Sequence, residues 1–180
     1  GGYTSSLMFG IQWDLMLAFM QNKGGVDVST LTTDSTSIGN YSNNKWSITN
    51  NKAKYSKDHG TSWNNGSYTK GEEGAVLLTT GASDSFAKMN IYDVAGNVCE
   101  WTLEGNQKYS DTASSKGVKL ASLINPQINP IRMADKIESA PCVFRGGYYG
   151  DDGTVYPASY RVFIRVGYCD AAIGFRVTLY

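Results

Sequence analysis

The chain has 180 residues, a formal net charge of zero and a pI near 6.8. This length allows one domain with a hydrophobic core or two small domains, and the balanced charge argues against binding of nucleic acid or an anionic membrane surface. The longest apolar stretch, Leu15 to Met20, is too short to span a bilayer, so no membrane insertion is expected. Heavy use of Gly, Asn, Ser, Thr and Tyr favours a turn-rich, irregular fold over a helical bundle.

The first predicted element is an amphipathic helix, which with its entry loop covers Leu7 to Met20. A stripe at helical spacing would form its apolar face, made of Ile11, Leu15, Ala18 and Phe19. Asp14 lies near the start of the helix, where the helix dipole favours a carboxylate. Gly24 and Gly25 are expected to end it.

The stretch from Asp27 to Glu73 is rich in Asn, Ser, Thr, Gly and Lys. Such a composition fits either a disordered linker or a long irregular segment that packs on a core. We favour the packed segment, because aromatic residues recur along the stretch at Tyr41, Trp46, Tyr55, Trp63 and Tyr68.

The rest of the chain alternates short apolar runs with polar loops. Ala75 to Thr80 predicts a buried strand or turn, Gly105 to Lys119 a polar surface insertion, and Ile131 to Ile137 a short helix. Strands are predicted at Cys142–Arg145, Arg161–Val166 and Phe175–Leu179. Because no internal repeat or domain boundary is visible, residues 1–180 are interpreted as a single domain.

Cysteine and histidine are scarce. An odd number of cysteines, Cys99, Cys142 and Cys169, argues against a complete disulfide framework and favours free, mostly buried thiols. The single His59 lies in a polar loop with no Cys or second His nearby. A zinc site or a His-based catalytic triad is therefore not expected there.

The segment from Tyr148 to Ala172 is flanked by Arg145-Gly146-Gly147 and Gly174-Phe175-Arg176-Val177. It contains no Lys, Glu, Gln, Met or Trp, although the chain has five Met and four Trp. These five residue types cannot be reached from an Asn codon by changing only its two adenines, whereas Tyr, Asp, Val, Ile, Phe, Gly, Cys, Ala, Ser and Arg can. The pattern is typical of binding proteins diversified by adenine-directed codon changes between fixed anchors. The alternative is an ordinary Tyr-rich sheet edge and loop.

Residues 89–101, which read MNIYDVAGNVCEW, carry a specific resemblance. They resemble the signature Asn-x-x-Gly-Leu-Tyr-Asp-Met-x-Gly-Asn-Val-x-Glu-Trp of the formylglycine-generating-enzyme (sulfatase-modifying-factor) family. The two flanking anchors and Arg161 match the family's downstream residues, and residues 10–14, GIQWD, look like a diverged form of its early helix. The resemblance implies that family's variant of the C-type lectin fold, a loop-rich α+β single domain. The large apolar residues Tyr92, Trp101, Phe144 and Phe175 are expected in its core.

The resemblance also implies a calcium ion in this motif. Its ligands would be the side chains of Asp93 and Glu100 and the backbone carbonyls of Gly96 and Val98. In the alternative, both carboxylates only accept backbone N–H hydrogen bonds. No other cofactor is expected.

Enzymatic activity is not expected. The formylglycine-generating enzymes depend on two reactive cysteines just after Arg-Gly-Gly, where residues 148–154 here contain no sulfur. Neither Cys99, inside the central motif, nor Cys169, in the later loop, has a cysteine partner near it in sequence. The related iron-dependent sulfoxide synthases need histidine ligands, and His59 is the only histidine.

The chain looks most like the variable proteins of diversity-generating retroelements, which occur in phages, bacteria and archaeal viruses and use the same fold. This resemblance implies a hypervariable surface on a virion or cell that binds a protein or cell-surface ligand. The alternatives are a fixed lectin-like or structural surface module and a diverged formylglycine-generating-type oxidase. The candidate variable, ligand-binding positions are Tyr148, Tyr149, Asp151, Asp152, Val155, Tyr156, Tyr160, Val162, Phe163, Ile164, Arg165, Val166, Tyr168, Asp170 and Ala171.

Tyrosine suits such a surface, because it gives a large contact area at low entropic cost and carries a hydroxyl. Asp and Arg side chains at these positions would add polar specificity. A fixed frame, Gly146, Gly147, Pro157, Gly174 and Phe175, would hold the backbone while the variable side chains change.

Overall fold

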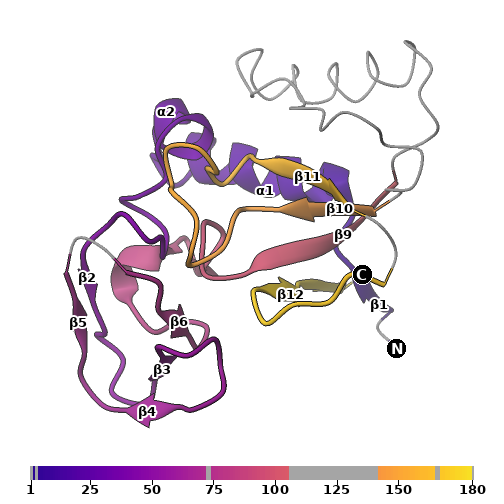
Figure 1. The fold of residues 1–180 in the computed structure, drawn as a ribbon. Coiled ribbons are helices and arrows are strands. Elements are labelled where there is room, and N and C mark those ends of the chain that lie inside the picture. The colour runs from indigo at the N-terminus through magenta and orange to yellow at the C-terminus, as the bar shows by residue number, and fades with distance from the viewer. Residues whose placement is uncertain (1, 3, 72–73, 106–141, 165–166, 180) are drawn as a thin grey trace.

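A four-stranded sheet lies in the middle of the fold (Figure 1). The computed structural model describes residues 2, 4–71, 74–105, 142–164 and 167–179. The strand order is β11 (Arg161–Ile164), β10 (Cys142–Arg145), β9 (Cys99–Gly105) and β12 (Ile173–Phe175). β10 pairs antiparallel with both β9 and β11, whereas β12 pairs parallel with β9. The sheet therefore brings both ends of the segment 148–172 to strands that flank β9.

The longer of the two α-helices in the described residues, α1 (Gly10–Asn22), packs against this sheet. Its buried side chains Trp13, Leu17 and Met20 join Tyr41 and Val94 in one hydrophobic cluster. The second helix, α2 (Val28–Thr32), is short and adds Leu31 to the same cluster.

The predicted apolar face of α1 is wrong. Ile11, Leu15 and Phe19 are exposed, and the opposite side, which carries Trp13 and Asp14, faces the core. Apolar residues surround the helix axis, so spacing alone did not determine which side packs. The buried side was selected by the bulk of Trp13 and by the charged partners that Asp14 finds on the sheet.

Several two- and three-stranded sheets complete the described part. β1 (Ser5–Leu7) pairs with β13 (Val177–Leu179), and β2 (Trp46–Ser47) pairs with β5 (Thr69–Lys70). β3 (Lys54–Ser56) lies between β4 (Asn64–Asn65) and β6 (Leu77–Leu78), and β7 (Ala87–Lys88) pairs with β8 (Ile91–Tyr92) after the 3-10 turn Asp84–Phe86. The described residues form a loop-rich, sheet-dominated fold with few helices.

Residues 27–71, the described part of the stretch 27–73, pack on the protein, as predicted from their aromatic residues. Tyr41 is fully buried in the first cluster, and Trp46 is buried in a second cluster with Ile48, Val76 and Phe86. Trp46 contacts Phe86 edge to face, with ring centroids 6.1 Å apart. The short strands of this segment thus close a second small core.

The four expected core aromatics behave differently from one another. Phe144 is buried, as predicted, and contacts the half-buried Trp101 with ring centroids 4.0 Å apart. Tyr92 is 40% exposed and Phe175 is 64% exposed, so their predicted burial is wrong. Phe175 lies on an edge strand of the four-stranded sheet, where its side chain has no covering layer among the described residues.

Other element boundaries also differ from the predictions. The closing strand is split at Arg176 into β12 and β13, and β11 is described only to Ile164. The predicted helix Ile131–Ile137 and residues 106–119 of the predicted insertion lie outside the described residues. Within the described ranges, no helix has the length and apolar character needed to cross a membrane. The three cysteines are free, as predicted, but Cys99 is the buried one, Cys142 is partly buried and Cys169 is exposed.

Candidate functional site

Four charged side chains form a partly buried network beneath the candidate site. Arg145 donates from Nη2 to Asp14 Oδ1 (2.6 Å) and from Nη1 to Glu104 Oε2 (3.2 Å). Arg161 donates from Nε to Glu104 Oε1 (3.0 Å) and from Nη2 to Asp14 Oδ2. Burial lowers the pKa of the fully buried Arg145, and the two carboxylates oppose that shift. Two cations and two anions thus join α1, β9, β10 and β11.

The turn after β10 depends on two glycines with left-handed backbones. Gly146 has φ 88° and Gly147 has φ 72°. A Cβ on Gly147 would lie 2.7 Å from the carbonyl oxygen of Tyr156, and one on Gly146 would lie 2.9 Å from that of Val94. Because both contacts are with backbone atoms, the turn excludes other residue types at these two positions.

The segment that starts at this turn is held through its backbone by residues near Tyr41. The buried hydroxyl of Tyr41 lies 2.8 Å from the carbonyl oxygen of Tyr156 and 3.1 Å from that of Gly146. Both the N–H and the hydroxyl of Ser42 donate to the carbonyl oxygen of Asp151 at 2.8 Å. Burial, followed by the nearby Asp151 charge, raises the pKa of Tyr41 and keeps it a neutral donor.

Further backbone contacts fix the middle of the segment. Trp13 Nε1 donates to the carbonyl oxygen of Ala158 (3.0 Å), and the Ala158 N–H donates to Ser35 Oγ (2.9 Å). The Ser159 N–H donates to the carbonyl oxygen of Leu31 (3.0 Å). None of these hydrogen bonds uses a side chain of the candidate segment, so each is compatible with many residue types there. Sequence reasoning missed this support, although the aromatic Tyr41 within an Asn- and Ser-rich stretch was a signal for it.

The candidate positions differ in exposure. Val155, Tyr168, Asp170 and Ala171 are exposed. Seven are partly buried: Tyr148, Asp151, Asp152, Tyr156, Tyr160, Val162 and Ile164. Arg165, Val166 and the side chain of Phe163 lie outside the described part of the structure.

Tyr149 departs from the prediction of one continuous exposed surface. Its side chain is only 1% exposed and packs in a cluster with Leu77 and Ala172. Its hydroxyl lies 2.6 Å from Nδ1 of His59, which belongs to a different loop. The predicted exposure is wrong here, and also at Ala172, because both side chains pack against Leu77 of β6. Pro157, assigned to the fixed frame, is buried.

The beginning and the end of the candidate segment meet at this cluster. Tyr148 and Tyr149 contact each other edge to face, with ring centroids 5.4 Å apart, and Ala172 packs beside them. Burial raises the pKa of both tyrosines, and the negative charge of Asp170 adds to the shift. Tyr156 and Tyr160 form another edge-to-face pair at 4.7 Å. Tyrosine rings and carboxylates are therefore brought together from both arms of the segment.

At the predicted calcium loop, the guanidinium of Arg176 faces the acidic residues. Its Nη2 donates to Glu100 Oε1 (2.7 Å), and its Nε lies 2.7 Å from Glu100 Oε2. The same Nη2 donates to the carbonyl oxygens of Tyr92 and Asp93, whereas Asp93 Oδ2 accepts from the Gly81 N–H (2.7 Å). Burial raises the pKa of Glu100 to about 7, and Arg176 opposes that shift.

A guanidinium thus faces both oxygens of Glu100, whereas Asp93 Oδ1 is buried without a hydrogen-bond partner in the part of the chain that the structure describes. The calcium ligand set of Asp93, Gly96, Val98 and Glu100 stays a prediction. Across the ranges that the structure describes, no group of three or more His, Cys, Asp or Glu could hold a metal. Asp93 accepts a backbone N–H, as the alternative predicted, whereas Glu100 accepts from a side chain.

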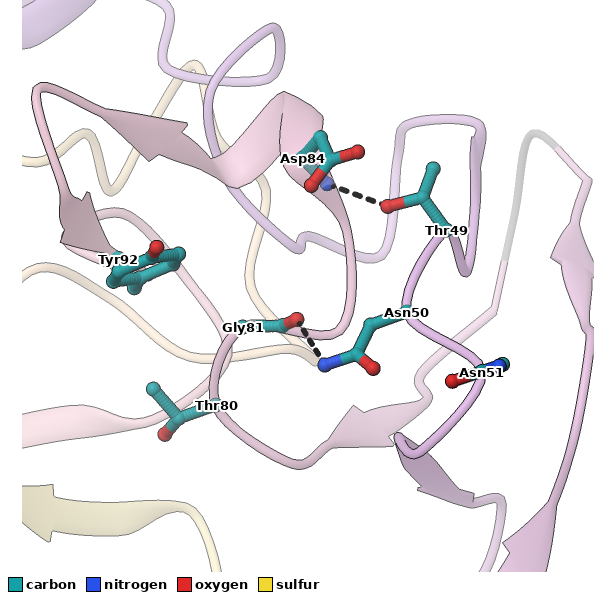
Figure 2. Close-up of a pocket in the computed structure, with 7 residues that line it drawn as sticks. All are labelled: Thr49, Asn50, Asn51, Thr80, Gly81, Asp84 and Tyr92. Atoms are coloured by element: carbon teal, nitrogen blue, oxygen red, sulfur yellow. Dashed lines mark hydrogen bonds between the residues drawn. The ribbon is translucent and has the colours of Figure 1, made fainter.

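A polar hollow of about 720 Å³ lies elsewhere on the surface, beside β8 (Figure 2). Asn50 Nδ2 donates to the carbonyl oxygen of Gly81 (3.1 Å), and Thr49 Oγ1 accepts from the Asp84 N–H (2.9 Å). The ring of Tyr92 stands at one side, and Asn51 and Thr80 complete the lining. No candidate position of the segment 148–172 contributes to this hollow.

We expect the stability of the protein to depend on pH through Asp151. Burial raises the pKa of this carboxyl to about 6, although the Tyr148 N–H donates to it (3.1 Å). The unfolded pKa is about 3.9, so protonated Asp151 favours the folded state at low pH, and this contribution is lost as pH rises through about 6. Because the side chain is partly exposed, we expect a loss of only about 1 kcal/mol between pH 4 and pH 8.

The measurement is chemical denaturation of the wild type and of Asp151→Asn between pH 4 and pH 8. The Asn amide oxygen can still accept from Tyr148 but cannot ionise. The difference between the two proteins isolates Asp151 from Glu100, which titrates in the same range. Parallel pH profiles would contradict the expectation.

No protein-family model matches the chain, and no curated protein sequence matches it. A solved structure that resembles it is Treponema denticola variable protein 1, with 19% sequence identity and a TM-score of 0.44. The match covers 96% of this chain and 46% of that chain, so this chain spans about half the length of the matched protein.

Proposed function

We propose that this chain is a ligand-binding domain of C-type lectin type whose surface between residues 148 and 172 is diversified by a retroelement. Its ligand is a protein or another cell-surface molecule, and its place is a virion or cell surface. The proposal combines the codon pattern of the segment with the motif of residues 89–101 and with the way the segment is held.

The observation that carries the proposal is the mode of anchoring. Tyr41, Ser42 and Trp13 bind backbone carbonyl oxygens of the segment, and Gly147 sets its entry turn. Side chains such as Val155 and Tyr168 point to solvent and take part in no such anchor. A surface built in this way can change its chemistry while its backbone keeps its conformation.

The side chains suit recognition rather than catalysis. Tyr148, Tyr156 and Tyr168 offer aromatic contact area with hydroxyl groups, and Asp170 adds a carboxylate. Burial raises the pKa of Cys99 strongly, so this thiol is a poor nucleophile. With no sulfur directly after Gly147, we propose a binding protein without enzymatic activity and without a required cofactor.

A display library provides the main test. Five accessible positions of the segment, Tyr148, Val155, Tyr156, Tyr168 and Asp170, are randomised together and the domain is selected on immobilised hen lysozyme. We expect folded clones, because Val155, Tyr168 and Asp170 are exposed, where substitutions typically cost less than about 0.5 kcal/mol of stability, and Tyr148 and Tyr156 are only partly buried. Some of these clones are expected to bind lysozyme with micromolar or better affinity. Binding is measured by titration calorimetry and folding by thermal melting.

The matched control randomises five exposed positions outside the segment, Lys23, Asn51, Lys52, Asp84 and Ser85. This library should remain folded but yield no binders at the same stringency. Equal recovery from both libraries, or general unfolding of the first, would contradict the proposal.

A fixed module that binds a small polar ligand is the second candidate function. The hollow in Figure 2 favours it, because amide and hydroxyl groups beside an aromatic ring suit a carbohydrate. The gene's surroundings separate the two candidates. A near-copy of the 3′ end with adenines at the variable codons, beside a reverse transcriptase gene, is expected only for the diversified domain.

A further inference from the structure

The loop from Lys57 to Trp63, which joins β3 to β4, is internally braced. Asp58 Oδ1 accepts from the Ser56 hydroxyl (2.7 Å) and the Ser62 N–H (2.9 Å), and its Oδ2 accepts from the Ser62 hydroxyl. The Gly60 N–H donates to Ser56 Oγ (2.7 Å). The hydrogen bonds from Ser62, followed by that from Ser56, lower the pKa of Asp58 to about 2, so this carboxylate is ionised at neutral pH.

Two contacts seat this loop against the candidate site. His59 Nδ1 lies 2.6 Å from the hydroxyl of Tyr149, and their ring centroids are 5.8 Å apart. Gly60 lies over Leu77, where an added Cβ would be 3.5 Å from the Leu77 Cδ2 atom. Leu77 itself packs with Tyr149 and Ala172, so the loop rests on the cluster where both arms of the segment meet.

The loop presents one aromatic and one cationic side chain, Trp63 and Lys57, at the surface. Trp63 is 41% exposed. The ammonium of Lys57 lies 4.6 Å from the ring centroid of Tyr68, which stacks on Tyr55 at 4.4 Å. Figure 1 shows the β3–β4 loop on the side of its sheet that faces β12. Broad aromatic surfaces with a few charges are typical of protein–protein contacts, in which Trp, Tyr and Arg dominate the binding energy.

We propose that the loop Lys57–Trp63 is a constant part of the surface that recognises a protein ligand, and that residue 149 determines how firmly this loop is seated. This inference rests on the proposed function only in its recognition part. Tyrosine at position 149 holds the loop by a hydrogen bond to His59. A residue without that hydroxyl releases the loop and thereby alters a surface that the variable segment does not itself contain. A change of residue type at the buried position 149 would therefore alter ligand binding indirectly, through the conformation of the loop Lys57–Trp63.

The seating is tested without any ligand. Tyr149→Phe removes only the hydroxyl, and His59→Asn removes the imidazole with a residue that tolerates the left-handed backbone at φ 58°. We expect either change to speed amide hydrogen exchange of residues 57–63 about tenfold, because one hydrogen bond is lost. The control Tyr168→Phe, at an exposed ring, should leave the loop unchanged. Unchanged loop exchange in both variants, with the fold intact, would overturn the seating.

The recognition part is tested on lysozyme-binding clones from the library above. Trp63→Ser and Lys57→Ser are introduced into each clone, with Lys52→Ser as an exposed control outside the loop. We expect Trp63→Ser to weaken binding at least tenfold in most clones, whereas Lys52→Ser has no effect. Clones that bind equally well with both loop substitutions would overturn this part while leaving the proposed function intact. Failure to obtain any lysozyme-binding clone would overturn both the proposed function and the recognition part. The contact between residue 149 and the loop would still be tested independently by the hydrogen-exchange measurement.

Discussion

Asp14→Ala is expected to lower the free energy of unfolding by about 3–5 kcal/mol, the range measured when one partner of a buried ion pair is removed. The Asp14 carboxylate is 2% exposed and binds both Arg145 and Arg161. Without it, Glu104 alone would face two guanidinium groups, one of them fully buried. Urea denaturation of the purified variant measures the loss.

The control for this experiment is Asp84→Ala. Asp84 is an exposed carboxylate at the surface hollow, so its removal should change stability by less than about 0.5 kcal/mol. If Asp14→Ala costs no more than Asp84→Ala, the network does not support α1 against the sheet.

Trp13→Ala is expected to cost a similar amount, about 3–5 kcal/mol, because it removes a large buried aromatic side chain. Trp13 is 1% exposed, and its ring lies under the Arg-Gly-Gly turn, where a Cβ on Gly146 would be 3.1 Å from the Trp13 Cζ2 atom. The substitution also breaks the hydrogen bond to the carbonyl oxygen of Ala158. Loss of this support should loosen the candidate segment together with the core.

Thermal melting of Trp13→Ala is compared with that of Trp63→Ala. Trp63 is 41% exposed, so the second variant should melt close to the wild type. Amide exchange near Ala158 should increase in the first variant only. A stable Trp13→Ala protein with unchanged exchange at Ala158 would show that the segment is anchored without the indole.

Sequence patterns predicted where short strands form better than they predicted which side chains are buried. The strand Cys142–Arg145 was expected and is present, because a β-rich apolar run next to Gly-Gly leaves little choice. The face of α1 was wrong, since Ile11 and Leu15 are as apolar as Leu17 and Met20. The deciding partners, Arg145 and Arg161, are more than a hundred residues away in the sequence.

At the candidate site, too, the sequence predicted local features but not the contacts between distant residues. Its boundaries followed from residue types that a codon pattern excludes, which is local information. The burial of Tyr149 depends on Leu77 and His59, which lie far from it in the sequence and carry no signal that pairs them with a tyrosine. The anchoring by Ser42 was equally invisible, because it is directed at backbone atoms and leaves no mark on the side chains of the segment.

For the diversified gene that we propose, anchoring through the backbone also limits which residue types the variable codons can encode in a folded protein. Changing both adenines of an AAC or AAT codon to cytosine gives proline, the one residue type that lacks a backbone N–H. The N–H of Tyr149 donates to the Asn97 carbonyl oxygen (3.0 Å), and the N–H groups of Val155 and Tyr156 donate to that of Asp152. Proline at these codons would remove a donor that the scaffold uses. Under the proposed diversification, the fold would remove proline variants at these codons, so the set of folded proteins would be smaller than the set of mutated genes.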